Sequence, residues 1–306
     1  MTTNKINSRI FAIGETTYDI LFQDGKPVGA CGGGSAFNSS ISLGRCGLPV
    51  SLISTFGNDR IGDLAFKMLE DNSVSCSLVK RFEGQSRVAL AFFNDNNNPE
   101  YSFYAASVEV IPDYPEPQKD DRILLGSSFA LRDKGRVELL NFLRKAHKAG
   151  CCVIYDPNAR RHLADDPHFM AKILENISLA TIVKGSDEDF RFIFNESDGE
   201  GAYTEIRKAG ADYLVYTKGP DGAELFASEF HFEVKAPELN VVSTIGAGDN
   251  FSAGLIFGLY TNLLNGLLFK DLKAEDWRKI IETGVLFASD VCQSVENYIS
   301  WETAKK

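Results

Sequence analysis

The stretch S-T-I-G-A-G-D-N-F-S-A-G, residues 243–254, decides what fold and what chemistry the chain is expected to have. The carboxylate of Asp249 follows three small residues at the start of an apolar helix: Gly246, Ala247 and Gly248. Glycines let the backbone approach a ligand closely. The first N–H groups of a helix lack partners within the helix, and the helix dipole adds partial positive charge there. The stretch therefore predicts a cradle for a phosphate, with an acid beside it that can accept a proton from an attacking hydroxyl.

Taken alone, this stretch leaves a second interpretation open. A Gly-x-Gly sequence before a helix is often only a tight turn, and an aspartate beside it can simply cap the helix. The apolar residues beyond Asp249 recur at helical spacing and predict a buried helix rather than a membrane span. The choice between a phosphate cradle and a plain cap depends on what the rest of the chain places nearby.

Composition narrows the possible functions. The chain has 306 residues, of which 44% are hydrophobic and 24% charged, enough for one large α/β domain or two small ones. Its 32 Lys and Arg against 42 Asp and Glu give a net charge of −10, which argues against nucleic acid or a membrane surface as a partner. No stretch resembles a signal peptide, and the cysteines show no C-x-x-C spacing. We therefore expect a cytoplasmic protein with free thiols.

Strand-like and helical segments alternate through the second half of the chain. Buried strands are predicted at residues 122–125, 152–155, 180–183 and 213–216, with helical patterns between them. This alternation predicts a parallel sheet covered by helices on both faces. Two polar hairpins near the N-terminus do not fit it. We expect them to form an accessory sheet, a lid over the site, from residues 16–31 and 86–108; the alternative is that they extend the main sheet.

Polar or glycine-rich clusters follow four of the predicted strands: residues 156–160, 184–189, 217–222 and 243–249. Ligands of open parallel sheets bind beyond the carboxyl ends of the strands, so these clusters are expected to converge on one edge. The sequence contains no P-loop motif, no G-x-G-x-x-G after the first strand and no G-x-S-x-G elbow. A P-loop protein, a dinucleotide enzyme and an α/β-hydrolase are thereby disfavoured.

With these motifs in place, the chain resembles the ribokinase-like (PfkB) carbohydrate kinases over nearly its whole length. Residues 243–249 are similar to that family's D-T-x-G-A-G-D signature, with Ser243 at the place of the first aspartate. Two further motifs resemble the family's N-terminal signature. They are G-G-x-x-x-N, with Gly33, Gly34 and Asn38, and G-x-D-x-x-G, with Gly57, Asp59 and Gly62. D-P-N-x-R at residues 156–160 is similar to the fructokinase-like branch, and T-K-G-x-x-G at residues 217–222 resembles the nucleotide-binding loop.

The resemblance implies a single three-layer α/β/α domain over residues 1–306, with a mostly parallel central sheet and a small β-sheet lid. It implies ATP-dependent phosphorylation of a sugar hydroxymethyl group, with Asp249 as general base and the amides of residues 246–248 as an anion hole. Arg160 would lie near the acceptor or the transferring phosphate. The sugar would meet Asp19, Gly33, Gly34, Asn38 and Asn158. ATP would meet Lys184, Ser186, Asp189, Thr217, Gly219 and Gly222, and Asp189 would also organise Mg²⁺ indirectly.

The chain departs from the family pattern at three places. The aspartate that Ser243 replaces helps to build a monovalent-cation site in relatives, so ATP and Mg²⁺ are expected here while that cation stays open. Ser186 and Asp189 stand where the family has N-x-x-E. Ala105 follows Phe103-Tyr104, where fructokinase-like relatives often carry a basic residue. The identity of the sugar is therefore left open.

Several alternatives remain at this stage. A weakly catalytic protein that binds sugar or nucleotide for regulation would keep the fold, and a nucleoside kinase would keep the chemistry. Asp19 could be a turn residue, Asn38 a polar group on a helix surface, and Arg160 a partner in surface ion pairs. Besides the sugar, the expected partner is a second copy of the chain, which would pair through an apolar lid face with residues such as Leu90, Phe92 and Phe103.

Overall fold

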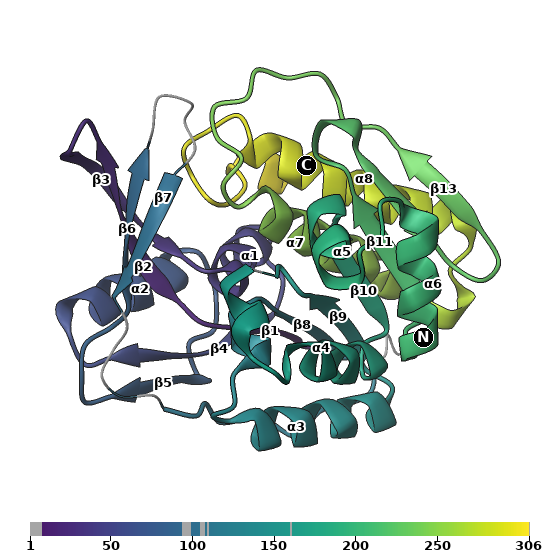
Figure 1. Ribbon diagram of the computed structural model, residues 1–306, viewed down its shortest axis with the longest axis horizontal. Helices are drawn as coiled ribbons and strands as arrows, with labels where there is room; N and C mark the ends of the chain where they lie inside the picture. The colour runs from purple at the N-terminus through teal and green to yellow at the C-terminus, as the bar shows by residue number, and fades with distance from the viewer. Residues whose placement is uncertain (1–7, 94–98, 105–107, 109, 160, 306) are drawn as a thin grey trace, which may run out of the picture.

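The computed structural model describes residues 8–93, 99–104, 108, 110–159 and 161–305. Within these ranges a nine-stranded sheet runs in the order β13-β12-β11-β10-β9-β8-β1-β4-β5 (Figure 1). Its strands are β1 (Ile10–Ile13), β4 (Val50–Gly57), β5 (Val79–Phe82), β8 (Arg122–Gly126), β9 (Cys152–Asp156), β10 (Ile182–Ser186), β11 (Tyr213–Thr217), β12 (Ala223–Phe226) and β13 (His231–Val234). Every pairing is parallel except those of β11 with β12 and β12 with β13. The predicted mostly parallel sheet is confirmed.

Helices cover both faces of this sheet because the strand side chains are apolar on both sides. Alternate strand residues belong to two separate hydrophobic clusters, with Ile10 in one and Phe11 in the other. The first cluster packs against α1 (Ser35–Arg45), α2 (Arg60–Asp71), α7 (Ala247–Leu264) and α8 (Ala274–Val291). The second packs against α3 (Arg136–Ala149), α4 (Phe169–Ser178), α5 (Asp187–Phe194) and α6 (Gly199–Ala209). Short 3₁₀ segments are η1 (Ser128–Leu131), η2 (Arg161–Asp165), η3 (Gly219–Asp221), η4 (Phe269–Asp271) and η5 (Thr303–Lys305).

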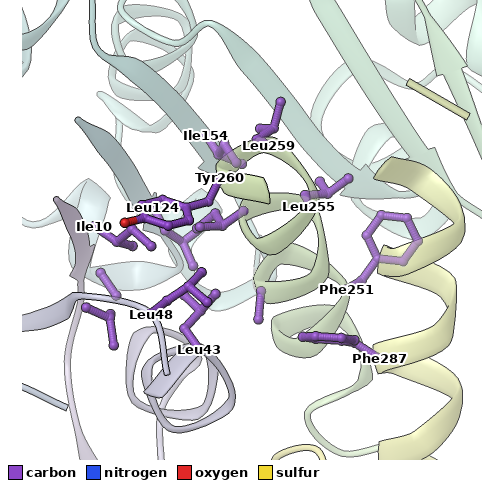
Figure 2. Close-up of a cluster of buried hydrophobic side chains, with 14 of the residues drawn as sticks. Ile10, Leu43, Leu48, Leu124, Ile154, Phe251, Leu255, Leu259, Tyr260 and Phe287 are labelled. Atoms are coloured by element: carbon purple, nitrogen blue, oxygen red, sulfur yellow. The ribbon is translucent and has the colours of Figure 1, made fainter. Parts of the chain in front are cut away.

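The helix α7 lies at the centre of the first cluster. Figure 2 shows Phe251, Leu255 and Leu259 of this helix among side chains from the sheet, from the region of α1 and from α8. A helix that is apolar on all sides is buried on all sides, and the burial of α7 between the sheet, α1 and α8 agrees with this. None of the helices described is long and apolar enough to cross a membrane.

The two N-terminal hairpins form a separate sheet and do not extend the main one (Figure 1). It has the order β3-β2-β6-β7, made of β2 (Thr17–Gln23), β3 (Lys26–Gly33), β6 (Val88–Phe93) and β7 (Pro99–Tyr104). The turn between β2 and β3 uses Asp24 and Gly25, both with positive φ. A parallel pairing of β2 with β6 joins the hairpins into this small sheet.

The register of the small sheet corrects one expectation. Phe103 pairs with Ala89, whereas Leu90 pairs with Ser102. Since successive side chains of a strand point to opposite faces, Phe103 lies on one face of the small sheet and Leu90 and Phe92 lie on the other. The three residues named for a pairing surface therefore do not form one apolar face. Phe103 shares its face with Asp19, because Asp19 also pairs with Ala89.

Candidate active site

Two residues from distant parts of the chain meet at the start of α7. The Nδ2 of Asn38 donates a hydrogen bond of 2.8 Å to Oδ2 of Asp249, 211 positions further along the chain. Asn38 is buried on α1, so it is not a polar group on a helix surface. Asp249 is half-buried, and its Oδ1 has no hydrogen-bond partner among the residues described. One oxygen of the carboxylate is thus held in place and the other can accept a proton.

The turn before Asp249 has the shape of an anion-binding nest. Gly246 has φ +78, and a β-carbon there would lie 2.8 Å from the carbonyl oxygen of Asn297, so this turn requires glycine. Within the described ranges the N–H groups of Gly246, Gly248 and Asp249 have no hydrogen-bond partner. The N–H of Ala247 donates a long bond of 3.3 Å to the carbonyl of Thr244. Of the three amides expected to bind an anion, those of Gly246 and Gly248 are therefore the unpartnered ones.

A buried polar network, which the sequence analysis missed, fixes this turn. The Nδ2 of Asn250 donates to the carbonyls of Gly246 at 2.7 Å and Asn297 at 2.8 Å, and its Oδ1 accepts from the hydroxyl of Ser42. The hydroxyl of Ser39 donates to the carbonyl of Asp249 at 2.8 Å. An asparagine inside an otherwise apolar helix, and serines along α1, were the available signals. Because buried polar groups need partners, such residues indicate a network.

Asp19 lies in the middle of β2 and not in the hairpin turn. It is buried, and the hydroxyl of Thr17 donates to its Oδ1 at 2.7 Å. A β-carbon on Gly33 would lie 2.4 Å from Oδ2 of Asp19, so the glycine leaves room for the carboxylate. Burial raises the pKa of Asp19 to about 6, against the smaller, lowering effect of the Thr17 hydrogen bond. The carboxylate and the two glycines predicted for the sugar site are thus neighbours at the junction of the two sheets.

The raised pKa of Asp19 predicts a pH-dependent loss of stability. The neutral form of Asp19 contributes to the free energy of unfolding. This contribution is fully present below the pKa of the unfolded chain, near 3.8, and is lost as pH rises through about 6. We expect Asp19→Asn, which cannot ionise, to raise the free energy of unfolding at pH 8 by about 3 kcal/mol. Denaturant unfolding at pH 8 and at pH 3.5 measures this. A gain that is equal at both pH values would contradict the assignment.

The structure describes only some of the other residues that were expected near the acceptor. Gly34 has φ +106, and a β-carbon there would lie 2.4 Å from the carbonyl of Glu15, so it must be glycine where β3 meets α1. Asn158 is half-buried after β9 and has φ +38. Arg160 and Ala105 lie outside the described residues, so the expectations for them stay predictions.

Lys184 is not at the protein surface. Its Nζ lies 2.8 Å from Oδ2 of Asp156, and the two residues are 4% and 2% exposed. Burial lowers the pKa of Lys184, but Asp156, Asp189 and Asp249 outweigh it and hold the pKa above its usual value. Burial raises the pKa of Asp156, partly offset by the ammonium of Lys184. Asp156 opens the D-P-N-x-R motif, yet sequence reasoning gave it no role.

Ser186 and Asp189 form the capping box that begins α5. The Oδ2 of Asp189 accepts from the backbone N–H and the hydroxyl of Ser186 at 2.8 and 2.7 Å. Its Oδ1 accepts from the backbone N–H of Ala159 at 2.9 Å. Both oxygens are engaged, and no group of three or more His, Cys, Asp or Glu side chains that could hold a metal exists among the described residues.

The loop after β11 has free space beside its backbone. Gly219 has φ +56, and no atom of the described residues lies within 4 Å of the place where its β-carbon would be. Gly222 has φ +94, and a β-carbon there would lie 2.1 Å from the carbonyl of Val234, so it shapes the β12–β13 side of the loop. The hydroxyl of Thr217 donates to the carbonyl of Gly185 at 3.2 Å. This ties the loop to the end of β10, next to Ser186.

Comparison with known proteins places this arrangement among kinases. The family model described as pfkB family carbohydrate kinase matches residues 8–304. A fructokinase from Rhizobium leguminosarum bv. trifolii is 29% identical over 82% of this chain and 79% of its own length. Aminoimidazole riboside kinase from Salmonella typhimurium is 27% identical over 83% and 82%. The crystal structure of an aminoimidazole riboside kinase from Salmonella enterica, complexed with aminoimidazole riboside and an ATP analogue, has the same fold, with a TM-score of 0.82, 23% identity and 95% of both chains covered.

Proposed function

The chain belongs to the pfkB family of carbohydrate kinases, and we propose that it transfers a phosphoryl group from ATP to a hydroxymethyl group of a small sugar. It is a phosphotransferase of the sugar and nucleoside kinase class. The observation that carries the finer proposal is the contact between Asn38 and Asp249 beside unpartnered amides of the turn at residues 246–248. That arrangement offers an acceptor for a proton and donors for an anion within one turn of helix.

Each group has a role in the proposed reaction. Phosphoryl transfer passes through a loose transition state, so catalysis consists mainly of positioning and charge stabilisation. The free Oδ1 of Asp249 would take the proton of the acceptor hydroxyl while Asn38 holds Oδ2, and a positioned base typically contributes ~10²–10⁴-fold. The amides of Gly246 and Gly248 would face the charge on the transferring group. A backbone donor so placed contributes roughly 3–4 kcal/mol.

The residues present fit Mg²⁺ bound mainly to phosphate and water. Magnesium commonly keeps several waters and is bound by one or two carboxylates together with substrate phosphates. Asp189 would reach the ion through water, because its two oxygens already accept hydrogen bonds from Ser186 and Ala159. When bound, the ion neutralises phosphate charge and so assists the transfer.

The acceptor class is proposed from the relatives. The fructokinase at 29% identity supports a fructokinase-like sugar kinase as the first candidate. The aminoimidazole riboside kinase at 27% identity supports a nucleoside kinase as the second. The small sheet, which carries Asp19 and Gly33, would act as a lid for either acceptor. A lid can cover the reacting hydroxyl and exclude water.

An acceptor panel tests this proposal. Purified protein is mixed with ATP, Mg²⁺ and, in turn, ketoses, pentoses, keto-deoxy acids and nucleosides that include aminoimidazole riboside, and ADP release is followed. We expect release well above the rate without acceptor for at least one ketose. Turnover with nucleosides alone would select the second candidate. Binding of sugar or nucleotide by calorimetry without any turnover would overturn the kinase proposal in favour of a regulatory binding protein.

A further inference from the structure

Beneath the first turn of α7 lies a buried ion pair that the proposed mechanism does not use. Asp156 ends β9 and Lys184 lies in the neighbouring strand β10. Their charged atoms are 2.8 Å apart. The hydroxyl oxygen of Ser252, on α7, lies 3.3 Å from Oδ2 of Asp156 and 3.2 Å from the carbonyl oxygen of Gly248, so its one hydrogen is shared between these two acceptors. The ion pair is therefore connected to the turn proposed to bind the phosphoryl group.

The ammonium also lies beside that turn, on the side where a side chain of residue 248 would project. A β-carbon built on Gly248 would lie 3.1 Å from Nζ of Lys184. Gly248 has no positive φ, so its backbone alone does not demand glycine. A side chain at this position would press on the lysine ammonium, so a glycine here lets the ammonium stay close to the turn.

The local charges show why a cation matters at this place. Asp156, Asp189 and Asp249 all act on Lys184 through their negative charge. A triphosphate would bring further negative charge to the same turn, and like charges repel strongly where water is excluded. Asp156 is bonded through Oδ2, while its buried Oδ1 has no hydrogen-bond partner among the residues that the structure describes. A pair serving only stability would be expected to have its carboxylate more fully bonded.

We propose that Lys184 is a positioning residue for phosphoryl transfer, whose buried ammonium supports the turn of Gly248 and offsets the negative charge gathered there. Asp156 holds the ammonium in place from β9. This inference rests on the proposed kinase function. Lys184 was expected to contact ATP directly, whereas here it acts on ATP through the backbone of Gly248. Lys184 thus raises kcat without touching the acceptor.

Three variants separate this role from a purely structural one: Lys184→Met, Asp156→Asn and the double variant. We expect Lys184→Met and the double variant to lose about 10-fold or more in kcat, with the acceptor KM within about twofold of the unmodified protein. The double variant removes both charges, so its thermal midpoint is expected to lie above that of Lys184→Met. Recovery of kcat together with stability in the double variant would overturn the proposal.

A second readout does not depend on turnover. Calorimetry measures the affinity of each variant for ADP and for the non-hydrolysable analogue AMP-PNP, which carries the third phosphate. We expect loss of the Lys184 charge to weaken AMP-PNP binding about 10-fold more than ADP binding; an unchanged ratio would refute the inference. If the unmodified protein phosphorylates no acceptor, the kinase proposal fails, and this ratio still decides whether Lys184 acts at the third phosphate.

Lys172→Met is the matched control. Lys172 is also a buried lysine, and its ammonium lies 2.6 Å from both Asp133 and Asp166, but it belongs to α4 in the other hydrophobic cluster. We expect this variant to lose stability while its kcat and its ratio of nucleotide affinities stay unchanged. A similar loss of kcat in Lys172→Met would mean that removing any buried lysine disturbs the enzyme, which would contradict a specific role for Lys184.

Discussion

Replacing Asp249 with asparagine is expected to lower kcat by about 10²-fold or more while the protein remains folded. The change removes the proton acceptor and little else, because asparagine has the same size and its amide oxygen can still accept the hydrogen bond from Asn38. The acceptor KM and the free energy of unfolding should stay close to those of the unmodified protein. Steady-state kinetics and denaturant unfolding on the same preparation measure both quantities.

Asp71→Asn provides the control for the loss of one carboxylate. Asp71 ends α2, is exposed, and pairs with Lys67 one turn earlier. Since exposed pairs of this kind contribute only a few tenths of a kcal/mol, this variant should keep both activity and stability. If Asp249→Asn retained more than about a tenth of kcat, another group would have to serve as base, and the mechanism proposed above would be wrong.

Asn250→Ala is expected to differ from Asp249→Asn by lowering the stability of the protein as well as its turnover. Removal of the amide leaves the carbonyl of Asn297 and the hydroxyl of Ser42 without their buried partner. A buried polar group left unpaired costs about 1–3 kcal/mol, so we expect the free energy of unfolding to fall by about 3 kcal/mol. The turn at Gly246 also loses its anchor, and kcat should fall at least ~10-fold because the anion donors are no longer fixed.

The same substitution elsewhere on α7 tests whether position or residue type matters. Within the described part of the chain, the side chain of Asn262 donates only to the carbonyl of Gly258, one turn earlier on the same helix. Asn262→Ala should therefore cost less than about 1 kcal/mol and leave kcat unchanged. Equal losses in the two variants would show that the network around Asn250 has no special part in shaping the site.

The sequence predicts the layers of this fold well because the relevant signals are local. Alternating strand and helix patterns gave the parallel sheet, and a turn at Asp24 and Gly25 gave the first hairpin. The strand β5 was missed. Its four residues, V-K-R-F, include two charges and are all half-buried, so neither alternation nor an apolar run marks them as a strand.

The parts of the site that escaped prediction depend on contacts between distant segments. The network of Asn250 joins α1, α7 and the segment after α8, and no local pattern specifies which asparagine meets which serine. Likewise, Lys184 was placed after the strand at residues 180–183, and no local pattern predicts that its side chain pairs with Asp156 on β9. Which side chains share a face of the small sheet depends on the pairing register of its strands. A single sequence does not specify that register where both faces carry polar and apolar residues.

The contact of Asn250 with Asn297 has a consequence for how the protein is made. During synthesis the N-terminal part of a chain emerges and begins to fold first. Here the turn that would bind the phosphoryl group is held by Asn297, which follows all the strands of the main sheet along the chain. A nascent chain can therefore assemble much of its sheet before this turn is fixed, and we expect that the proposed phosphoryl transfer cannot begin until Asn297 has been synthesised.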